Sequence, residues 1–157
     1  MRRLERHGRI ERMVDRSQTL ILQMPSGRAV LGDSQLLRGY CLLIAEPEVA
    51  SLNDLPLEGQ MVFLRDMALL GRAVQDATGC ARVNYSVYGN TDPFLHAHVF
   101  ARYVTEDAEK AKMPVWMSYT QSERDAVLFT LKHHGALQLE LSGRLLELLR
   151  GSSRFIK

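Results

Sequence analysis

Two histidines separated by one residue, His96 and His98, are the side chains best suited to chemistry in this sequence. Leu95, Ala97 and Val99 alternate with them, as in a strand that buries one face. Since side chains alternate between the two faces of a strand, both imidazoles are predicted to point the same way. Such a pair is compatible with structural hydrogen bonding, with chelation of a metal ion, and with acid–base or nucleophilic chemistry at an acyl or phosphoryl group.

The segment before these histidines is rich in turn-forming residues, with the sequence Gly89-Asn-Thr-Asp-Pro93. It is predicted to connect one strand to the next. The N–H groups around Gly89 and the amide of Asn90 would then lie beside the imidazoles, where they could bind phosphate oxygens. Asn84 offers another amide at the start of the preceding strand, although it could equally cap that strand.

The same run resembles the active-site segment of the histidine-triad (HIT) superfamily of nucleotide hydrolases and transferases. Members carry a pattern like Gly-Asn/Gln-x-x-Pro-His-φ-His-φ-His-φ-φ-Pro-Arg, where φ is apolar. The matching positions here are Gly89, Asn90, Pro93, Phe94, His96, His98, Val99, Phe100, Ala101 and Arg102. Phe94 stands where the family has its first histidine, so the triad is degenerate. The resemblance covers roughly half of the chain, from about residue 20 to 103.

The resemblance implies a role for each matching residue. His96 would be the nucleophile that attacks phosphorus and forms a phosphoramidate, and His98 would bond to phosphoryl oxygen or to the leaving group. The carbonyl of Phe94 would hold the tautomer of the nucleophile, while the ring of Phe94 packs beneath it. Asp33 is similar to the acidic residue that holds the nucleoside ribose, although it could simply form a turn. Tyr40 stands where an auxiliary histidine is common.

The implied function is a metal-independent hydrolase or transferase that cleaves a phosphoanhydride or phosphoramidate bond of a nucleoside phosphate, without a cofactor. The alternative is a nucleotide-binding protein of the same fold that does not turn over its ligand. A metal-dependent enzyme that uses His96 and His98 ranks last, because no third ligand stands at a clear spacing. The resemblance also implies a homodimer. The aromatic segment around Trp116 could supply its interface, or could form a satellite core of the monomer.

The alternation and periodicity of apolar residues predict an α+β fold with a five-stranded antiparallel sheet. The expected strands span residues 19–24, 28–33, 39–45, 81–88 and 95–103. A long helix is expected over residues 57–77, because its apolar residues recur at steps of three and four. This helix should pack across one face of the sheet.

The whole chain, 1–157, is expected to form one domain with its core at about residues 17–104. An Arg-rich helical arm over residues 1–16 would present either a solvated face or a phosphate-attracting one. A C-terminal helix is expected over residues 121–150. His133 and His134 lie within it and are expected on its surface, since adjacent helical residues point about 100° apart.

The overall composition is that of an ordinary globular protein, with 157 residues, 46% apolar and 24% charged. The formal net charge of +2 does not indicate a nucleic-acid partner. No apolar run reaches the ~20 residues of a membrane span, and no signal peptide is apparent, so a cytoplasmic location without membrane contact is expected. Cys41 and Cys80 lack a C-x-x-C spacing and are expected to be reduced packing residues.

Overall fold

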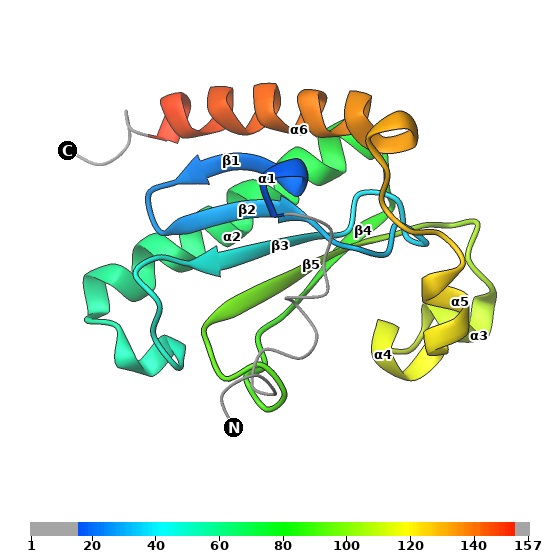
Figure 1. The fold of residues 1–157 in the computed structure, drawn as a ribbon, viewed down its shortest axis with the longest axis horizontal. Coiled ribbons are helices and arrows are strands. Elements are labelled where there is room, and N and C mark those ends of the chain that lie inside the picture. Colours follow the sequence, from blue (N-terminus) through cyan, green and yellow to red (C-terminus); the bar gives the residue numbers. More distant parts are fainter. Residues whose placement is uncertain (1–15, 153–157) are drawn as a thin grey trace, which may run out of the picture.

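The computed structural model describes residues 16–152 and contains a five-stranded sheet (Figure 1). Its strands are β1 (Leu20–Met24), β2 (Gly27–Leu31), β3 (Cys41–Ala45), β4 (Arg82–Ser86) and β5 (His96–Arg102). They lie in the order β1-β2-β3-β5-β4, and each neighbouring pair is antiparallel. The predicted sheet is therefore confirmed, and each strand begins and ends within two residues of its expected bounds.

The helices differ widely in length. They are α1 (Arg16–Thr19), the 3-10 turn η1 (Leu52–Asp54), α2 (Leu57–Thr78), α3 (Ala108–Ala111), α4 (Val115–Ser118), α5 (Gln121–Asp125) and α6 (Leu131–Ser152). The predicted long helix corresponds to α2, which ends at Gly79 in the left-handed conformation, with φ of 65°. Within residues 16–152 no helix is long and apolar enough to cross a membrane. The predicted arm over 1–16 lies outside the described residues, apart from Arg16.

The main hydrophobic core lies between one face of the sheet and the helices α2 and α6, which run along it (Figure 1). Leu43, Ala97 and Val99 contribute from the central strands, and Phe63 and Leu141 contribute from the two helices. Cys41 and Cys80 are both free thiols within this core, as predicted. This buried layer fixes β5, because the strand's odd-numbered side chains are enclosed by it.

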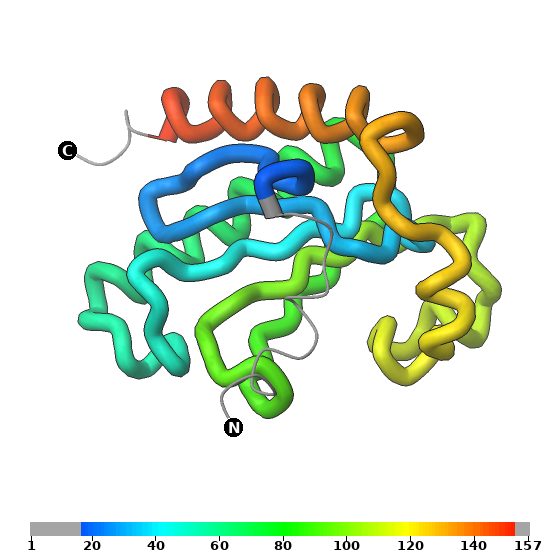
Figure 2. The backbone as a smooth tube through the Cα atoms, in the orientation of Figure 1, coloured from blue at the N-terminus to red at the C-terminus, as the bar shows by residue number. Residues whose placement is uncertain are grey.

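The opposite face of the sheet is covered less completely. A smaller apolar cluster lies there, which includes Leu42, Phe94, Phe100 and Val115. The chain from α3 to α5 forms a compact group beside the end of the sheet before it returns to α6 (Figure 2). This arrangement leaves one face of β5 open to a cavity.

The prediction of one continuous helix over 121–150 was wrong, because the chain forms α5 and α6 with an extended link between them. In this link Leu128 forms an antiparallel bridge with Ser34. The N–H of Phe129 donates to the carbonyl of Asp33 at 2.7 Å, and the Phe129 ring enters the main core. Burial of this ring and pairing of its backbone outweigh continued helical hydrogen bonding.

His134 corrects a second expectation, since it is buried rather than on the surface. Its Nδ1 accepts a hydrogen bond from the N–H of Thr130 at 3.0 Å, and its ring stacks on Phe129. Burial lowers the pKa of His134. His134 is therefore part of the start of α6, where the Thr130 hydroxyl also accepts from the N–H of His133.

Candidate active site

The side chains of His96 and His98 share one face of β5, as the sequence predicted. Both line a single cavity, whereas the intervening residue Ala97 is packed in the main core. Their rings lie nearly perpendicular, with 4.9 Å between the centroids. Pairing with β3, which aligns Ile44 with His96 and Leu42 with His98, holds the two positions from the neighbouring strand.

The cavity has a volume of about 240 Å³ and lies over the centre of the sheet. The strands contribute Leu42, His96, His98 and Phe100 to it. The segment after β2 contributes Asp33, Ser34, Leu36, Leu37 and Tyr40, and the loop before β5 contributes residues 88–92. Val115, Trp116, Gln121, Arg124 and Asp125 close the remaining side. Segments from four parts of the chain thus meet around the two imidazoles.

His96 is held in one tautomer by a main-chain carbonyl. Its Nδ1 lies 2.8 Å from the carbonyl oxygen of Phe94. A carbonyl only accepts hydrogen bonds, so Nδ1 must carry the proton and donate it. In the neutral ring, Nε2 then keeps its lone pair. The ring of Phe94 packs against His96 with 5.0 Å between centroids, but Phe94 itself is buried in the apolar cluster and does not line the cavity.

His98 has a different partner, the hydroxyl of Tyr40, which lies 2.7 Å from its Nδ1. Four aromatic rings surround this imidazole: Phe100 stacks parallel to it, Tyr40 and Tyr88 lie at 6.0 and 6.1 Å, and Trp116 meets it edge-on at 5.3 Å. Burial, together with the neighbouring His96, lowers the pKa of His98 to about 3. His98 is therefore neutral at physiological pH and carries one ring proton.

The loop residues Gly89 and Asn90 line the cavity together with the histidines, as does Asp33 from the end of β2. One carboxylate oxygen of Asp33 accepts from the N–H of Ser34 at 2.9 Å, so the predicted local turn is present. The same residue faces the cavity, and so the turn and a ligand-binding role are compatible. The structure therefore brings five of the predicted site residues together with Tyr40.

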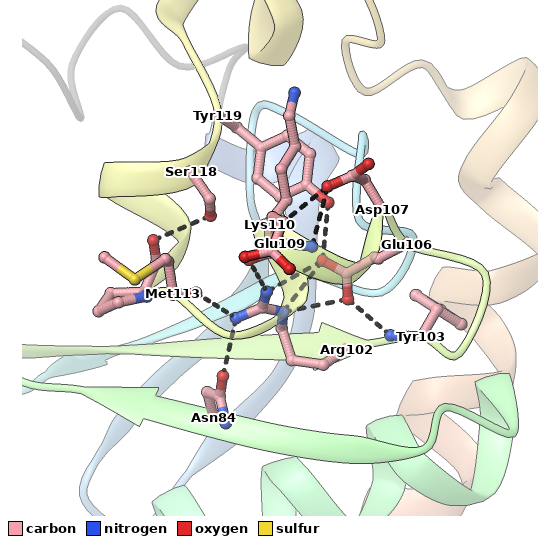
Figure 3. A network of polar contacts seen from close by, with 11 residues as sticks. Asn84, Arg102, Tyr103, Glu106, Asp107, Glu109, Lys110, Met113, Ser118 and Tyr119 are labelled. Atoms are coloured by element: carbon pink, nitrogen blue, oxygen red, sulfur yellow. Dashed lines mark hydrogen bonds and ion pairs between the residues drawn. The ribbon is translucent and has the colours of Figure 1, made fainter.

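Asn84, like Phe94, is a predicted site residue that does not line the cavity. Its Oδ1 accepts a hydrogen bond from Nη1 of Arg102 at 3.0 Å (Figure 3). Arg102 also donates to Glu106 and to the carbonyls of Lys110 and Met113. This placement follows from the register, which aligns Asn84 with Phe100, two residues beyond His98 on β5. Asn84 thus anchors a structural arginine instead of facing the imidazoles.

The cavity also contains residues that sequence reasoning did not assign to it. Trp116 on α4 packs edge-on against Tyr40, Phe100 and His98, which corresponds to the satellite-core alternative for this aromatic segment. The guanidinium of Arg124 on α5 lies 4.9 Å from the centre of the Trp116 ring. No local pattern indicated that α4 and α5 fold back over β5. The single tryptophan of the chain was the available signal.

Among residues 16–152 no three side chains of His, Cys, Asp or Glu lie close enough to hold a metal ion together. The groups that the cavity offers to a ligand include the two imidazoles, backbone and side-chain amides of the loop, and the carboxylate of Asp33. A lone pair on His96 and a ring proton on His98 suit attack on phosphorus with a hydrogen bond to a developing charge.

Solved structures with a similar fold include histidine-triad proteins. A histidine triad protein from Marinobacter aquaeolei is 21% identical over 82% of this chain and 89% of its own, with a TM-score of 0.69. One from Sinorhizobium meliloti is 20% identical over 94% of this chain and 93% of its own, with a TM-score of 0.65. A hypothetical histidine triad nucleotide-binding protein from Sulfolobus tokodaii is 12% identical over 83% and 85%, with a TM-score of 0.62.

No family model matches the sequence, and no curated protein matches it. The likeness therefore lies in the fold, which the chain shares at an identity too low to extend to activity. Residues 16–152 adopt the histidine-triad fold, as the sequence motif implied.

Proposed function

We propose, given the histidine-triad fold and the paired imidazoles, that this protein is a nucleotide hydrolase or nucleotidyl transferase. Its substrate is a nucleoside phosphate with a phosphoanhydride or phosphoramidate bond, as in a dinucleoside polyphosphate. The observation that carries the proposal is the hydrogen bond from Nδ1 of His96 to the carbonyl of Phe94 at 2.8 Å. It keeps a lone pair on Nε2 of an imidazole that lines a cavity.

In the first step Nε2 of His96 attacks the phosphorus atom and a P–N bond forms. The bond to the leaving group breaks, and the leaving group departs with the electron pair. His98 donates a hydrogen bond to the developing negative charge, and Asn90 with the loop N–H groups binds the non-bridging oxygens. In the second step water attacks phosphorus, the P–N bond breaks, and one proton of the water passes to solvent. The nucleoside monophosphate leaves, and His96 is neutral again.

The nucleoside is proposed to lie on the side of Asp33, Leu36 and Leu37. A carboxylate accepts hydrogen bonds from two neighbouring ribose hydroxyls, and the two leucines supply apolar contact for a base. All three residues line the cavity that contains the histidines. The volume of about 240 Å³ lies slightly below the ~300–1,000 Å³ usual for small-molecule sites, which favours one nucleotide unit in the cavity at a time.

Trapping the covalent intermediate tests this mechanism directly. Protein mixed with a labelled dinucleoside polyphosphate is quenched at high pH, where phosphoramidates persist, and digested for mass spectrometry. The expected result is nucleotidyl mass on the peptide that contains His96, absent from His96→Ala. Turnover without label on that peptide, or full turnover by His96→Ala, contradicts the proposal. Turnover that is lost on chelation would support the metal-dependent reading instead.

The second candidate is a nucleotide-binding protein with little turnover. Phe94 in place of the first triad histidine favours it, because this ring offers no proton or hydrogen bond to the site. The Sulfolobus tokodaii protein of the same fold is described as nucleotide-binding. Calorimetry with a nucleoside monophosphate, run beside a turnover assay on the same sample, distinguishes the two functions. Binding without turnover over hours would support the second.

A homodimer is also proposed. Leu57, Met61 and Leu64 on α2 expose apolar side chains, and so do Tyr85 and Val87 at β4, which forms an edge of the sheet. Exposed apolar side chains and an open strand edge are each typical of interaction surfaces. Light scattering at micromolar concentration is expected to give twice the monomer mass of 17.8 kDa. A monomer mass would contradict a stable dimer.

A further inference from the structure

The loop between β2 and β3 fixes the position of Tyr40 through its buried backbone. The side-chain amide of Gln35 donates to the carbonyls of Gly32 and Tyr40, and its oxygen accepts from the N–H of Gly39. The N–H of Gly32 also donates to the carbonyl of Tyr40 at 2.8 Å. Gln35 is almost fully buried, so these bonds are shielded from water. The loop is thus held closed around the tyrosine.

The ring of Tyr40 is fixed as firmly as its backbone. It stacks on Phe100 with 4.4 Å between centroids and lies against the backbone of Gly32. A Cβ atom at position 32 would lie 2.2 Å from the tyrosine ring, so only glycine leaves room for it. Tyr40 therefore presents its hydroxyl to Nδ1 of His98 from a preorganised position, at 2.7 Å.

We propose that Tyr40 is a positioning residue whose hydroxyl donates to Nδ1 of His98 and thereby holds the ring proton of His98 on Nε2. The inference rests on the proposed function only for its catalytic consequence. The two imidazoles are then fixed in opposite tautomers. His96 donates a hydrogen bond from Nδ1–H to a carbonyl and keeps a lone pair on Nε2, whereas His98 accepts a hydrogen bond at Nδ1 and keeps its proton on Nε2.

The direction of this hydrogen bond follows from the chemistry of the groups. An imidazole nitrogen with a free lone pair is a good acceptor, and a phenolic hydroxyl is a good donor to it. Neutral His98 has one ring proton to place, because its pKa is lowered to about 3. With that proton on Nδ1, the bare lone pair of Nε2 would face the phosphoryl oxygens and repel them. With the proton on Nε2, the same atom donates to them.

Nitrogen-15 spectra of histidine-labelled protein test the proposal without any turnover. The ring nitrogens with and without a proton have distinct shifts and couplings, and His96→Gln and His98→Gln assign the two residues. The expected result is a proton on Nε2 of His98 and on Nδ1 of His96. In Tyr40→Phe, which retains the ring and its stacking, the proton of His98 should be shared between the two nitrogens. A wild-type His98 that carries its proton on Nδ1 overturns the proposal.

A matched control is Phe100→Leu, which removes the stacked ring but retains the tyrosine hydroxyl. Its His98 tautomer should remain that of the wild type. If the tautomer changes as much in Phe100→Leu as in Tyr40→Phe, packing and not the hydroxyl determines it, and the proposal fails.

Kinetics test the catalytic consequence. Tyr40→Phe should lower kcat about tenfold with KM nearly unchanged, less than the ~100- to 1000-fold loss expected when a catalytic donor is removed. If kcat is unchanged in Tyr40→Phe although the ring proton of His98 is shared between its two nitrogens, Tyr40 has no catalytic consequence. If the tautomers are as expected but wild-type protein forms no covalent intermediate, the proposed function fails and the assignment of Tyr40 stands.

Discussion

The two halves of β5 present side chains to the same face of the sheet, but they use them in opposite ways. His96 and His98, in the first half, have one hydrogen bond each and line a cavity. Arg102, at the end of the strand, directs all five of its N–H groups to protein acceptors (Figure 3). It is as deeply buried as the histidines.

The charge of each half reflects its partners. Burial alone would raise the pKa of Glu106, but hydrogen bonds from Arg102, Tyr119 and the N–H of Tyr103 outweigh it and lower the pKa. Burial, together with the hydrogen bond to Glu106, raises the pKa of Tyr119 to about 12. The arginine half is therefore a charged pair with complete hydrogen bonding. In the histidine half, burial and the neighbouring His96 keep His98 neutral.

A structural polar group differs from one available to a ligand in how many of its hydrogen-bonding atoms already have partners in the protein. Arg102 has no donor left, so its role is to join β5 to the segment that carries α3 and α4. That segment brings Trp116 to the cavity. Within residues 16–152, Nδ1 of His96 bonds to Phe94 and Nε2 has no hydrogen-bond partner, so Nε2 is the atom available to a ligand.

The largest expected effect is the loss of turnover in His96→Ala. Removal of the nucleophile eliminates the covalent route, and a decrease in kcat of at least ~10⁴-fold is expected. Binding of a nucleoside monophosphate should persist, because Asp33, Asn90 and the loop N–H groups remain. Steady-state kinetics and calorimetry on the same sample measure both effects. His133→Ala is the matched control, since this imidazole is exposed and does not line the cavity.

Arg102→Met should cause the largest loss of stability. It leaves the carboxylate of Glu106 buried without its ion pair, which typically costs about 3–5 kcal/mol in the free energy of unfolding. Urea denaturation measures this change. In the double variant Arg102→Met, Glu106→Leu, no unpaired charge remains, and its loss should be smaller than the sum of the two single losses. Additive losses would mean that the pair is not coupled.

Acid should destabilise the protein through His98. The pKa of its folded form is about 3, below the usual 6.5, so between these values the unfolded chain binds a proton that the folded protein does not. The contribution of His98 to the free energy of unfolding is therefore fully present above pH 6.5 and is lost as the pH falls toward 3. From pH 7 to 5 this residue should contribute a loss of about 2 kcal/mol in the free energy of unfolding.

His98→Gln isolates this contribution, because glutamine does not titrate and His134 and Glu106 are retained. The difference in unfolding free energy between pH 7 and pH 5, measured by denaturant titration, should be smaller in the variant than in the wild type. An identical pH dependence in both proteins would show that His98 is accessible to protons in the folded state.

The smallest expected effect is that of Asn84→Ala. This variant tests whether Asn84 acts with Arg102 or with the two histidines. Loss of its hydrogen bond to Arg102 should lower the free energy of unfolding by about 1–2 kcal/mol. KM for the nucleotide should remain unchanged, because Asn84 does not line the cavity. A clear rise in KM with an unchanged free energy of unfolding would show that Asn84 contacts the substrate.

The sequence by itself determined the sheet, the long helix and the shared face of His96 and His98. These features are local, since alternation with a period of two and apolar spacing near 3.6 residues specify each element. The carbonyl partner of His96 was also expected, because the resemblance to the histidine-triad superfamily implied it, and it lies only two residues away. The loop of Gly89 and Asn90 is adjacent in sequence to the strand that it serves, so its place at the cavity could be inferred.

Only the tertiary structure decided the partners that come from distant segments. Tyr40 meets His98 across a separation of 58 residues, and Trp116 lies on the segment after β5 that Arg102 binds through the carbonyl of Met113. The break between α5 and α6 has the same origin, because burial of Phe129 and its bond to Asp33 override a helical pattern. Asn84 was misplaced because alternation predicts the face of a strand, whereas the register with β5 determines its neighbour on that face.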